Sequence, residues 1–194
     1  MDVFMDKKIS TIIETNRLLL RTATYQDTQS IYQLYSLPES SHYEYWEPID
    51  LAKANRLVRR WVRNQQKHPC SAYHFVVFLK AKEFMIGMCG LEIGFNPSEA
   101  GQIGHVGYRY FPESWGNGYA TEALSSVVEF AFSQLSLHKV ESGCVKENSA
   151  SARVLEKSGF RLEGCRRQGF LIGQKWHDFM VYGILRKDMA PSQT

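Results

Sequence analysis

The segment formed by residues 104–122 constrains the fold of this chain more than any other. Residues 106–111 have the pattern of a β-strand, and Pro112 ends it because proline has no N–H for a strand ladder. A turn containing Gly116 follows and leads into a predicted helix whose first turn holds Gly118, Tyr119 and Ala120. The first N–H groups of a helix have no partner within it, and the positive end of the helix dipole lies beside them. The segment therefore predicts a strand, turn and helix that bind a phosphate group.

Two common nucleotide-binding patterns share this layout, but neither matches the chain. A dinucleotide fingerprint requires a third glycine where Thr121 stands, with an acidic residue at the end of the next strand. A P-loop requires Gly-Lys-Ser or Gly-Lys-Thr, which the segment lacks. Both comparisons argue against a nucleotide-binding site of these types.

The segment instead resembles motif A of the GCN5-related N-acetyltransferases (GNAT), whose Gln/Arg-x-x-Gly-x-Gly/Ala pattern holds the pyrophosphate of acetyl-CoA. Gly118 and Ala120 fill the last two positions, while Trp115 stands where Gln or Arg is usual. In the form Trp-Gly-x-Gly-Tyr-Ala-Thr-Glu-Ala it is similar to the RimJ/RimL branch, which acetylates protein N-termini, including those of ribosomal proteins. Residues 148–160 resemble motif B of the same family, and residues 14–21 resemble its opening, "E-T-x-R-L-x-L-R".

The order of elements predicts an α/β fold. Strands are expected at residues 17–21, 75–79, 85–93, 102–111, 139–145, 160–167 and 175–185. Helices are expected after Asp27, after Asp50, after motif A and from Asn148. In the helix after motif A, apolar residues recur at helical spacing and predict a core-facing stripe. Strands that alternate with helices and end in a hairpin indicate a mixed sheet. The resemblance implies the GNAT fold: a mostly antiparallel sheet of about seven strands and about four helices, with a splayed strand pair that forms the acetyl-CoA slot.

Length and composition indicate one globular unit. The 194 residues suffice for a core without metal or disulfide support. We expect an N-terminal extension over residues 1–13, a single acetyltransferase domain over 14–188 and a tail over 189–194. The four cysteines and six histidines show no metal-ligand spacing, and no signal or membrane-spanning segment is evident, so we expect a reduced cytoplasmic protein without metal. Monomer and homodimer remain alternatives.

One helix face is strongly basic. Arg56, Arg59, Arg60 and Arg63 share a face opposite Ala54, Leu57, Val58 and Trp61. The net charge of +3 is too small to predict DNA binding. The basic face is interpreted either as a solvated surface or as a docking site for an acidic protein or ribosomal RNA.

The resemblance implies transfer of acetyl directly from acetyl-CoA to a primary amine, without a covalent enzyme intermediate. It assigns the cofactor to strand residues Arg109, Tyr110 and Phe111, to motif B residues Asn148 and Ser151, and to the turn and helix start, namely Trp115, Gly116, Asn117, Gly118, Tyr119, Ala120 and Thr121. A backbone N–H near Tyr110 is the expected donor to the thioester carbonyl.

Two further roles depend on motif B. Many relatives place a tyrosine at the position of Leu155 to protonate the leaving thiolate, and Ser151 is the expected replacement here. Asn148 is the expected anchor for the pantetheine arm, with plain helix capping as the alternative for both residues. Cys144 matches a cysteine that some RimL-like sequences place near the cofactor sulfur, but a small core residue is the favoured interpretation.

The acceptor side is less defined. An aromatic and acidic loop over residues 41–48 resembles the segment that walls the acceptor site in the family, so Tyr45, Trp46 and, from a strand, Glu92 are candidate substrate-binding residues. Phe170 replaces an acid found in RimL-like relatives, which leaves the general base open among Glu92, His105, His177 and Asp178.

Three functions remain open. An N-terminal α-amino group, with a pKa of about 7.7–8.0, needs little help from a base, so a protein N-terminus is the leading acceptor. A small-molecule amine, namely a polyamine, amino sugar or amino acid, is the second hypothesis. A non-catalytic acetyl-CoA-binding regulatory module is the third, because the expected acid is absent.

Overall fold

The computed structural model describes residues 11–67, 69–82, 84–94 and 102–189. Its strands form one sheet in the order β1-β2-β3-β4-β5-β6-β8-β7. The strands are β1 (Ile12–Glu14), β2 (Leu18–Thr22), β3 (Ala72–Leu79), β4 (Phe84–Gly94), β5 (Ile103–Tyr110), β6 (Lys139–Val145), β7 (Arg161–Ile172) and β8 (Lys175–Leu185). Every neighbouring pair is antiparallel except β5 and β6, which confirms the mixed, mostly antiparallel sheet predicted from the sequence.

The sheet has eight strands rather than about seven, because a strand forms at residues 12–14, before the first predicted strand. Ile13 pairs with Leu20 in β1 and β2, so residues 12 and 13 are not part of an irregular start. A three-residue strand is too short for its alternation to be recognised in a sequence. β7 also runs beyond the predicted residue 167, with register shifts on both sides of Arg166.

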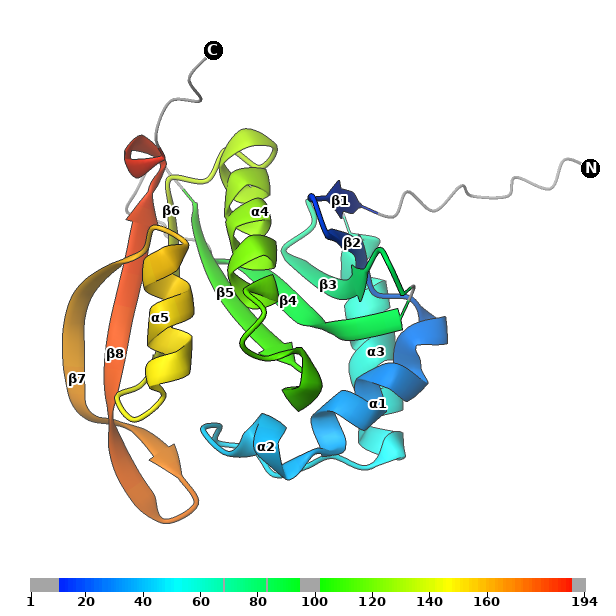
Figure 1. Cartoon of the computed structure of the whole chain (residues 1–194), viewed down its shortest axis with the longest axis horizontal. Coiled ribbons are helices and arrows are strands. Elements are labelled where there is room, and N and C mark those ends of the chain that lie inside the picture. The colour runs from blue at the N-terminus through cyan, green and yellow to red at the C-terminus, as the bar shows by residue number, and fades with distance from the viewer. Residues whose placement is uncertain (1–10, 68, 83, 95–101, 190–194) are drawn as a thin grey trace, which may run out of the picture.

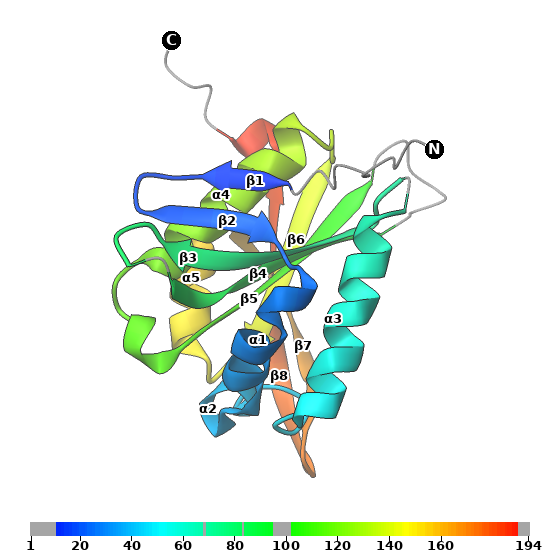
Figure 2. The same ribbon diagram turned by 90° about the vertical axis from the view of Figure 1, so that its right-hand side faces the viewer.

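The helices cover both faces of the sheet (Figures 1 and 2). They are α1 (Thr28–Ser36), α2 (Pro38–Ser41), α3 (Leu51–Gln65), α4 (Tyr119–Ser133) and α5 (Ser149–Lys157). α4 and α5 lie on one face, and α1 and α3 lie on the other. The short α2 was not predicted: Pro38 ends the preceding helix but also occupies the first position of the next, where its missing N–H costs nothing. Within the described residues, no helix is long and apolar enough to cross a membrane.

Each face has its own hydrophobic core. The apolar stripe predicted on α4 is buried against β2, β4 and β5, with Leu124 and Val127 fully inaccessible. On the other face, Ile31 and Leu34 of α1 pack with Val58 of α3. Asp50 caps α3 as expected, because its carboxylate accepts the Lys53 N–H at 2.6 Å.

Asp27 does not act as expected. It stands at the N-cap of α1, but its carboxylate accepts from the Arg21 guanidinium and from Thr24, not from the helix. Burial raises the pKa of Asp27, but these hydrogen bonds outweigh burial and hold it below its ordinary value. Asp27 therefore ties α1 to β2 through a buried ion pair.

The sheet opens between β5 and β6, as the resemblance implied. These strands pair at three positions only, Ile103 with Lys139, Gly104 with Val140 and His105 with Glu141. Beyond them β5 stays paired with β4, and β6 stays paired with β8. The two halves of the sheet therefore separate along a gap between α4 and α5 (Figure 1).

Candidate active site

The turn before α4 presents a series of unpaired backbone donors. Gly116 and Gly118 have φ angles of +74° and +77°, a conformation that residues with a Cβ rarely adopt. The N–H of Trp115 donates to Pro112, and the N–H of Glu122 donates to Gly118. Between them, the N–H groups of residues 116–121 have no backbone acceptor within the described part of the chain. We call this turn and first helical turn the cradle.

Arg17, from the turn between β1 and β2, braces the cradle. Its Nε contacts a Glu122 carboxylate oxygen at 2.7 Å, and its Nη1 donates to the Asn117 carbonyl at 3.1 Å. The guanidinium lies 4.7 Å from the centre of the Tyr119 ring. Despite these contacts, the Arg17 side chain is 45% exposed. Glu122 also accepts from Thr15, so the first residues of the sheet hold the start of α4 in place. The contact between Arg17 and Glu122 is not predictable from the sequence, because the two residues are 105 positions apart.

The gap between β5 and β6 exposes backbone groups of alternate residues of β5. The Phe111 N–H donates to Ile86 beside β4, and because successive residues of a strand face opposite neighbours, Tyr110 and Tyr108 face the gap. The Tyr110 carbonyl accepts from the Trp115 indole at 2.9 Å, which leaves the Tyr110 N–H as a donor in the gap. The Tyr110 N–H, the predicted donor, therefore faces the gap, whereas the Phe111 N–H is already committed to the sheet.

Ser151, in the first turn of α5, belongs to a hydroxyl pair. Its Oγ lies 2.8 Å from the Tyr108 hydroxyl, which also donates to the Ser151 carbonyl at 3.0 Å. The side chain of Asn148 accepts the Ser151 N–H at 3.0 Å, so Asn148 is the N-cap of α5. Capping by Asn148 does not involve the Ser151 hydroxyl, whose partner is the Tyr108 hydroxyl.

Burial shifts the pKa of Tyr108, a member of this pair, and of Cys144, which contacts Ser151. Burial raises the pKa of Tyr108 well above its ordinary value, so the phenol is protonated at neutral pH. Burial also raises the pKa of Cys144, despite a hydrogen bond with Ser151, which favours the thiol over a nucleophilic thiolate. Tyr108 was missed in the sequence, although it lies two residues from Tyr110 and so shares its face of the strand.

On the opposite face, the Arg109 side chain holds the loop of residues 41–48. Its guanidinium contacts the Glu44 carboxylate at 2.9 Å, and its Nε donates to the Ser40 carbonyl at 3.1 Å. It also lies 4.5 Å from the ring centres of both Tyr35 and Trp46, which stack on each other. Burial raises the pKa of Glu44, against the lowering effect of the Arg109 charge. Arg109 was predicted to act through its backbone, but its side chain, 14% exposed, is the part that organises the site.

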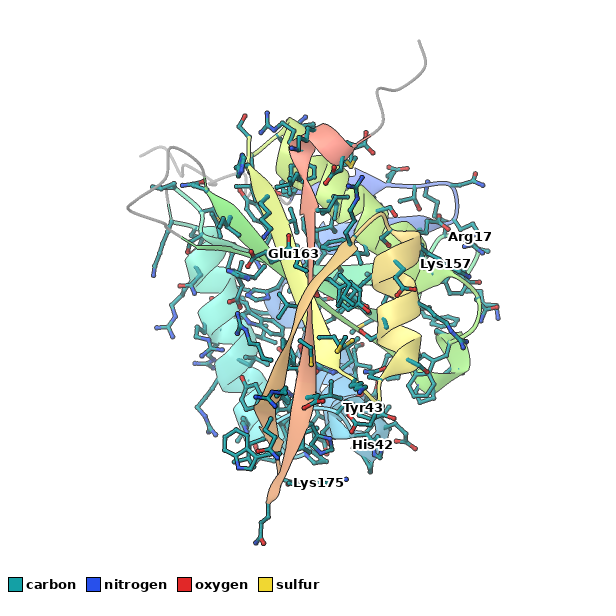
Figure 3. The ribbon with its side chains drawn as sticks, turned by 90° about the vertical axis from the view of Figure 1, so that its left-hand side faces the viewer. Arg17, His42, Tyr43, Lys157, Glu163 and Lys175 are labelled. Carbon is teal, nitrogen blue, oxygen red and sulfur yellow. The ribbon has the colours of Figure 1, made fainter. Side chains whose placement is uncertain are left out.

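Aromatic residues line the acceptor side. Tyr45, 74% exposed, meets the Phe170 ring edge to face at 6.0 Å, and Phe170 stacks on Phe179 at 5.1 Å. Figure 3 shows Tyr43 of the same loop at the end of the molecule where Lys175 marks the β7–β8 hairpin. Phe170, where an acid was expected, therefore joins the hairpin to the loop.

The remaining polar candidates lie on strands β4, β5 and β8. Glu92 pairs with His105 across β4 and β5. Burial raises the pKa of Tyr35, and the charge of Glu92 adds to that effect. His177 lies opposite Phe170 in the hairpin and faces Glu147 at 3.3 Å. Asp178 accepts the Gln168 N–H, which indicates a structural role for Asp178. No cluster of at least three His, Cys, Asp or Glu side chains able to hold a metal occurs in the described ranges.

Comparisons with known proteins agree with this geometry. Residues 17–161 match the family model described as "Acetyltransferase (GNAT) domain". The chain is 30% identical over 177 residues to the uncharacterized N-acetyltransferase YoaA of Bacillus subtilis, covering 90% of this chain and 97% of that protein.

Two solved structures have the same fold. The ribosomal-protein-S5-alanine acetyltransferase of Vibrio fischeri superposes with a TM-score of 0.80 at 23% identity, covering 93% of this chain and 100% of the other. The spermidine N-acetyltransferase of Vibrio cholerae, in complex with CoA and spermine, superposes with a TM-score of 0.77 at 23% identity, covering 90% and 98%.

Proposed function

Because this chain belongs to the GNAT family and is an N-acetyltransferase, we propose that it transfers acetyl from acetyl-CoA to the α-amino group of a protein or peptide N-terminus. The observation that carries the proposal is the arrangement at the gap between β5 and β6. The Tyr110 N–H and the Ser151 hydroxyl approach it from β5 and α5, close to the cradle on α4.

The chain fits acetyl-CoA. Unpaired N–H groups of residues 116–121 suit a pyrophosphate, and glycine at positions 116 and 118 keeps side chains away from it. Asn148, the peptide groups of Tyr108 and the Tyr110 N–H suit the polar pantetheine arm, because unpaired backbone groups in a gap need partners. When bound, acetyl-CoA supplies a thioester that an amine can attack.

The residues of the chain then have separate tasks. The Tyr110 N–H is a fixed dipole for the carbonyl oxygen. The Ser151 Oγ holds a proton for the leaving sulfur, and the neutral Tyr108 hydroxyl, 2.8 Å away, orients it. Arg109 and Glu44 position the loop that faces the acceptor.

The acceptor side favours a peptide N-terminus over a polyamine. Its walls are the rings of Tyr45, Phe170 and Phe179, and the Glu44 carboxylate is already neutralised by Arg109. A polycation would require carboxylates without such partners, whereas an N-terminal residue offers one amine and an apolar side chain. An α-amino group is also partly neutral at pH 7, which suits a site where Phe170 replaces an acid.

Mass spectrometry of products tests the assignment. The protein is incubated with acetyl-CoA and a panel of peptides, spermidine, amino sugars and amino acids. Acetylated peptide N-termini are expected. Acetylated small amines alone would reassign the acceptor, and tight binding of CoA without any product would indicate a regulatory module.

Replacing Arg17 with alanine should weaken CoA binding about tenfold, because the cradle loses the brace that orders its N–H groups. Calorimetric titration with CoA measures the effect. Arg161→Ala, which removes an exposed arginine at the far edge of the sheet, is the matched control and should bind as the wild type does. An unchanged affinity in Arg17→Ala would show that the cradle does not depend on this contact.

Replacing Arg109 with methionine should raise KM for the peptide about tenfold and change the Kd for CoA less than about twofold. The change leaves the partly buried Glu44 without a cation and frees the loop of residues 41–48. Steady-state kinetics with a variable peptide, together with CoA titration, separate the two effects. A loss confined to CoA binding would place Arg109 on the cofactor side instead.

A further inference from the structure

A groove on the α3 side of the molecule is separate from the site described above. It has a volume of about 500 Å³ and is lined by Tyr25, Thr28, Asn55, Arg59 and Arg63. Asn55, Arg59 and Arg63 follow one another at every fourth position of α3 and form one wall, while Tyr25 and Thr28 form the other. The volume is in the range of ligand sites rather than of packing defects.

The charge of this helix is not balanced locally. α3 carries five cationic side chains and no carboxylate, so the rest of the chain has a net charge of −2 (+3 less +5). Among the described residues, no carboxylate lies within ion-pair distance of any of its four arginines, namely Arg56, Arg59, Arg60 and Arg63, all of which are exposed. Elsewhere, Arg17, Arg21 and Arg109 are each paired with a carboxylate. Cationic side chains without carboxylate partners, gathered on one face, create a positive potential that attracts an anionic partner.

The spacing of the two groove arginines indicates that the partner is an extended peptide segment. Arg59 and Arg63 are one helical turn apart, about 6 Å along the helix axis. In an extended peptide, alternate side chains point the same way at about 6.6 Å. Carboxylates at alternate positions of an extended segment therefore match the two guanidinium groups, each of which can bind a carboxylate through two N–H groups.

A nucleic acid fits less well. Single-stranded nucleic acids require aromatic platforms for successive bases in addition to cations. The groove has one aromatic side chain, Tyr25, and two arginines, and the chain as a whole is only slightly basic.

We propose that the groove between α3 and the start of α1 binds an extended acidic segment of another protein, with its carboxylates on Arg59 and Arg63. Tyr25 and Thr28 contact the other side of the segment. The groove lies beside the start of α1, which is the end of this helix away from the loop of residues 41–48. Figure 2 shows the two ends of α1. Docking in the groove therefore does not depend on which amine is acetylated.

Fluorescence anisotropy with a labelled peptide of about eight residues, bearing glutamate at alternate positions, tests the proposal. The wild type should bind it, more weakly as salt is added. Arg59→Ala/Arg63→Ala should lose about tenfold or more in affinity. Arg56→Ala/Arg60→Ala removes the same charge from the same helix outside the groove, and it should lose less than about threefold.

Equal losses in the two double variants would overturn the proposal, because they would indicate attraction by charge alone. No binding by the wild type at low salt would also overturn it. Tighter binding of a single-stranded RNA of equal charge, lost in the same variant, would assign the groove to nucleic acid instead. Unfolding temperatures of both variants verify that the fold is intact.

Discussion

Replacing Ser151 with alanine should lower kcat about a hundredfold while leaving the Kd for CoA within about twofold. The hydroxyl is the proposed proton donor to the leaving sulfur, and the Tyr108 hydroxyl lies 2.8 Å from it. Helix α5 should remain intact, because its cap is the Asn148 side chain on the Ser151 N–H, which alanine retains. The proposed role therefore predicts a loss in turnover without a loss in binding.

Two companion variants make this measurement specific. Tyr108→Phe should lower kcat about tenfold, because Ser151 keeps its hydroxyl but loses the partner that orients it. Ser126→Ala, in α4, removes a hydroxyl that only bonds the Ala123 carbonyl, and it should leave kcat unchanged. Parallel losses of turnover and CoA affinity in Ser151→Ala would make Ser151 a binding residue and remove it from the proton transfer.

Replacing Gly118 with valine should weaken CoA binding about a hundredfold. Gly118 has a φ of +77°, which costs a β-branched residue about 1–2 kcal/mol. Relief of that strain would turn the peptide groups of the cradle, and losing one charge-assisted hydrogen bond to phosphate costs about 1.5–3 kcal/mol. A loss of about 2.8 kcal/mol, near the upper end of that range, corresponds to a factor of a hundred in Kd.

Calorimetric titration with CoA measures this loss, and Gly164→Val is the matched control. Gly164 lies in the edge strand β7, where an added Cβ meets no atom within 4 Å and φ is not positive. This control should bind CoA as the wild type does. Undiminished binding by Gly118→Val would separate the cradle from the cofactor and remove the basis of the proposed function.

The parts of the fold that depend on local pattern were predicted well. The apolar stripe on α4 is the core stripe of the structure, and Asp50 and Asn148 are the caps of α3 and α5. In each case the signal lies within a few residues, because helix periodicity and capping are local properties. The splayed pair of strands was implied by the family resemblance, and the structure shows it.

The contacts that assemble the site were not predictable in this way. Arg17 reaches Glu122, Arg109 reaches Glu44, and Tyr108 reaches Ser151, each across a long stretch of chain. A single sequence contains no local pattern that identifies such long-range contacts. Phe170 illustrates the same limit: the sequence shows a missing acid, and the structure shows a ring that packs on Tyr45 and Phe179.

The sequence by itself determined the elements, their order, the glycine turn at the start of α4 and the type of chemistry, because these follow from short-range backbone preferences. Only the tertiary structure decided which groups remain free. Sheet pairing commits the Phe111 N–H and leaves the Tyr110 N–H in the gap, and ion pairing commits Arg17, Arg21 and Arg109 but leaves Arg59 and Arg63 in a groove. Whether a polar group can serve a ligand depends on whether another part of the chain already satisfies it, and that is a property of the folded molecule alone.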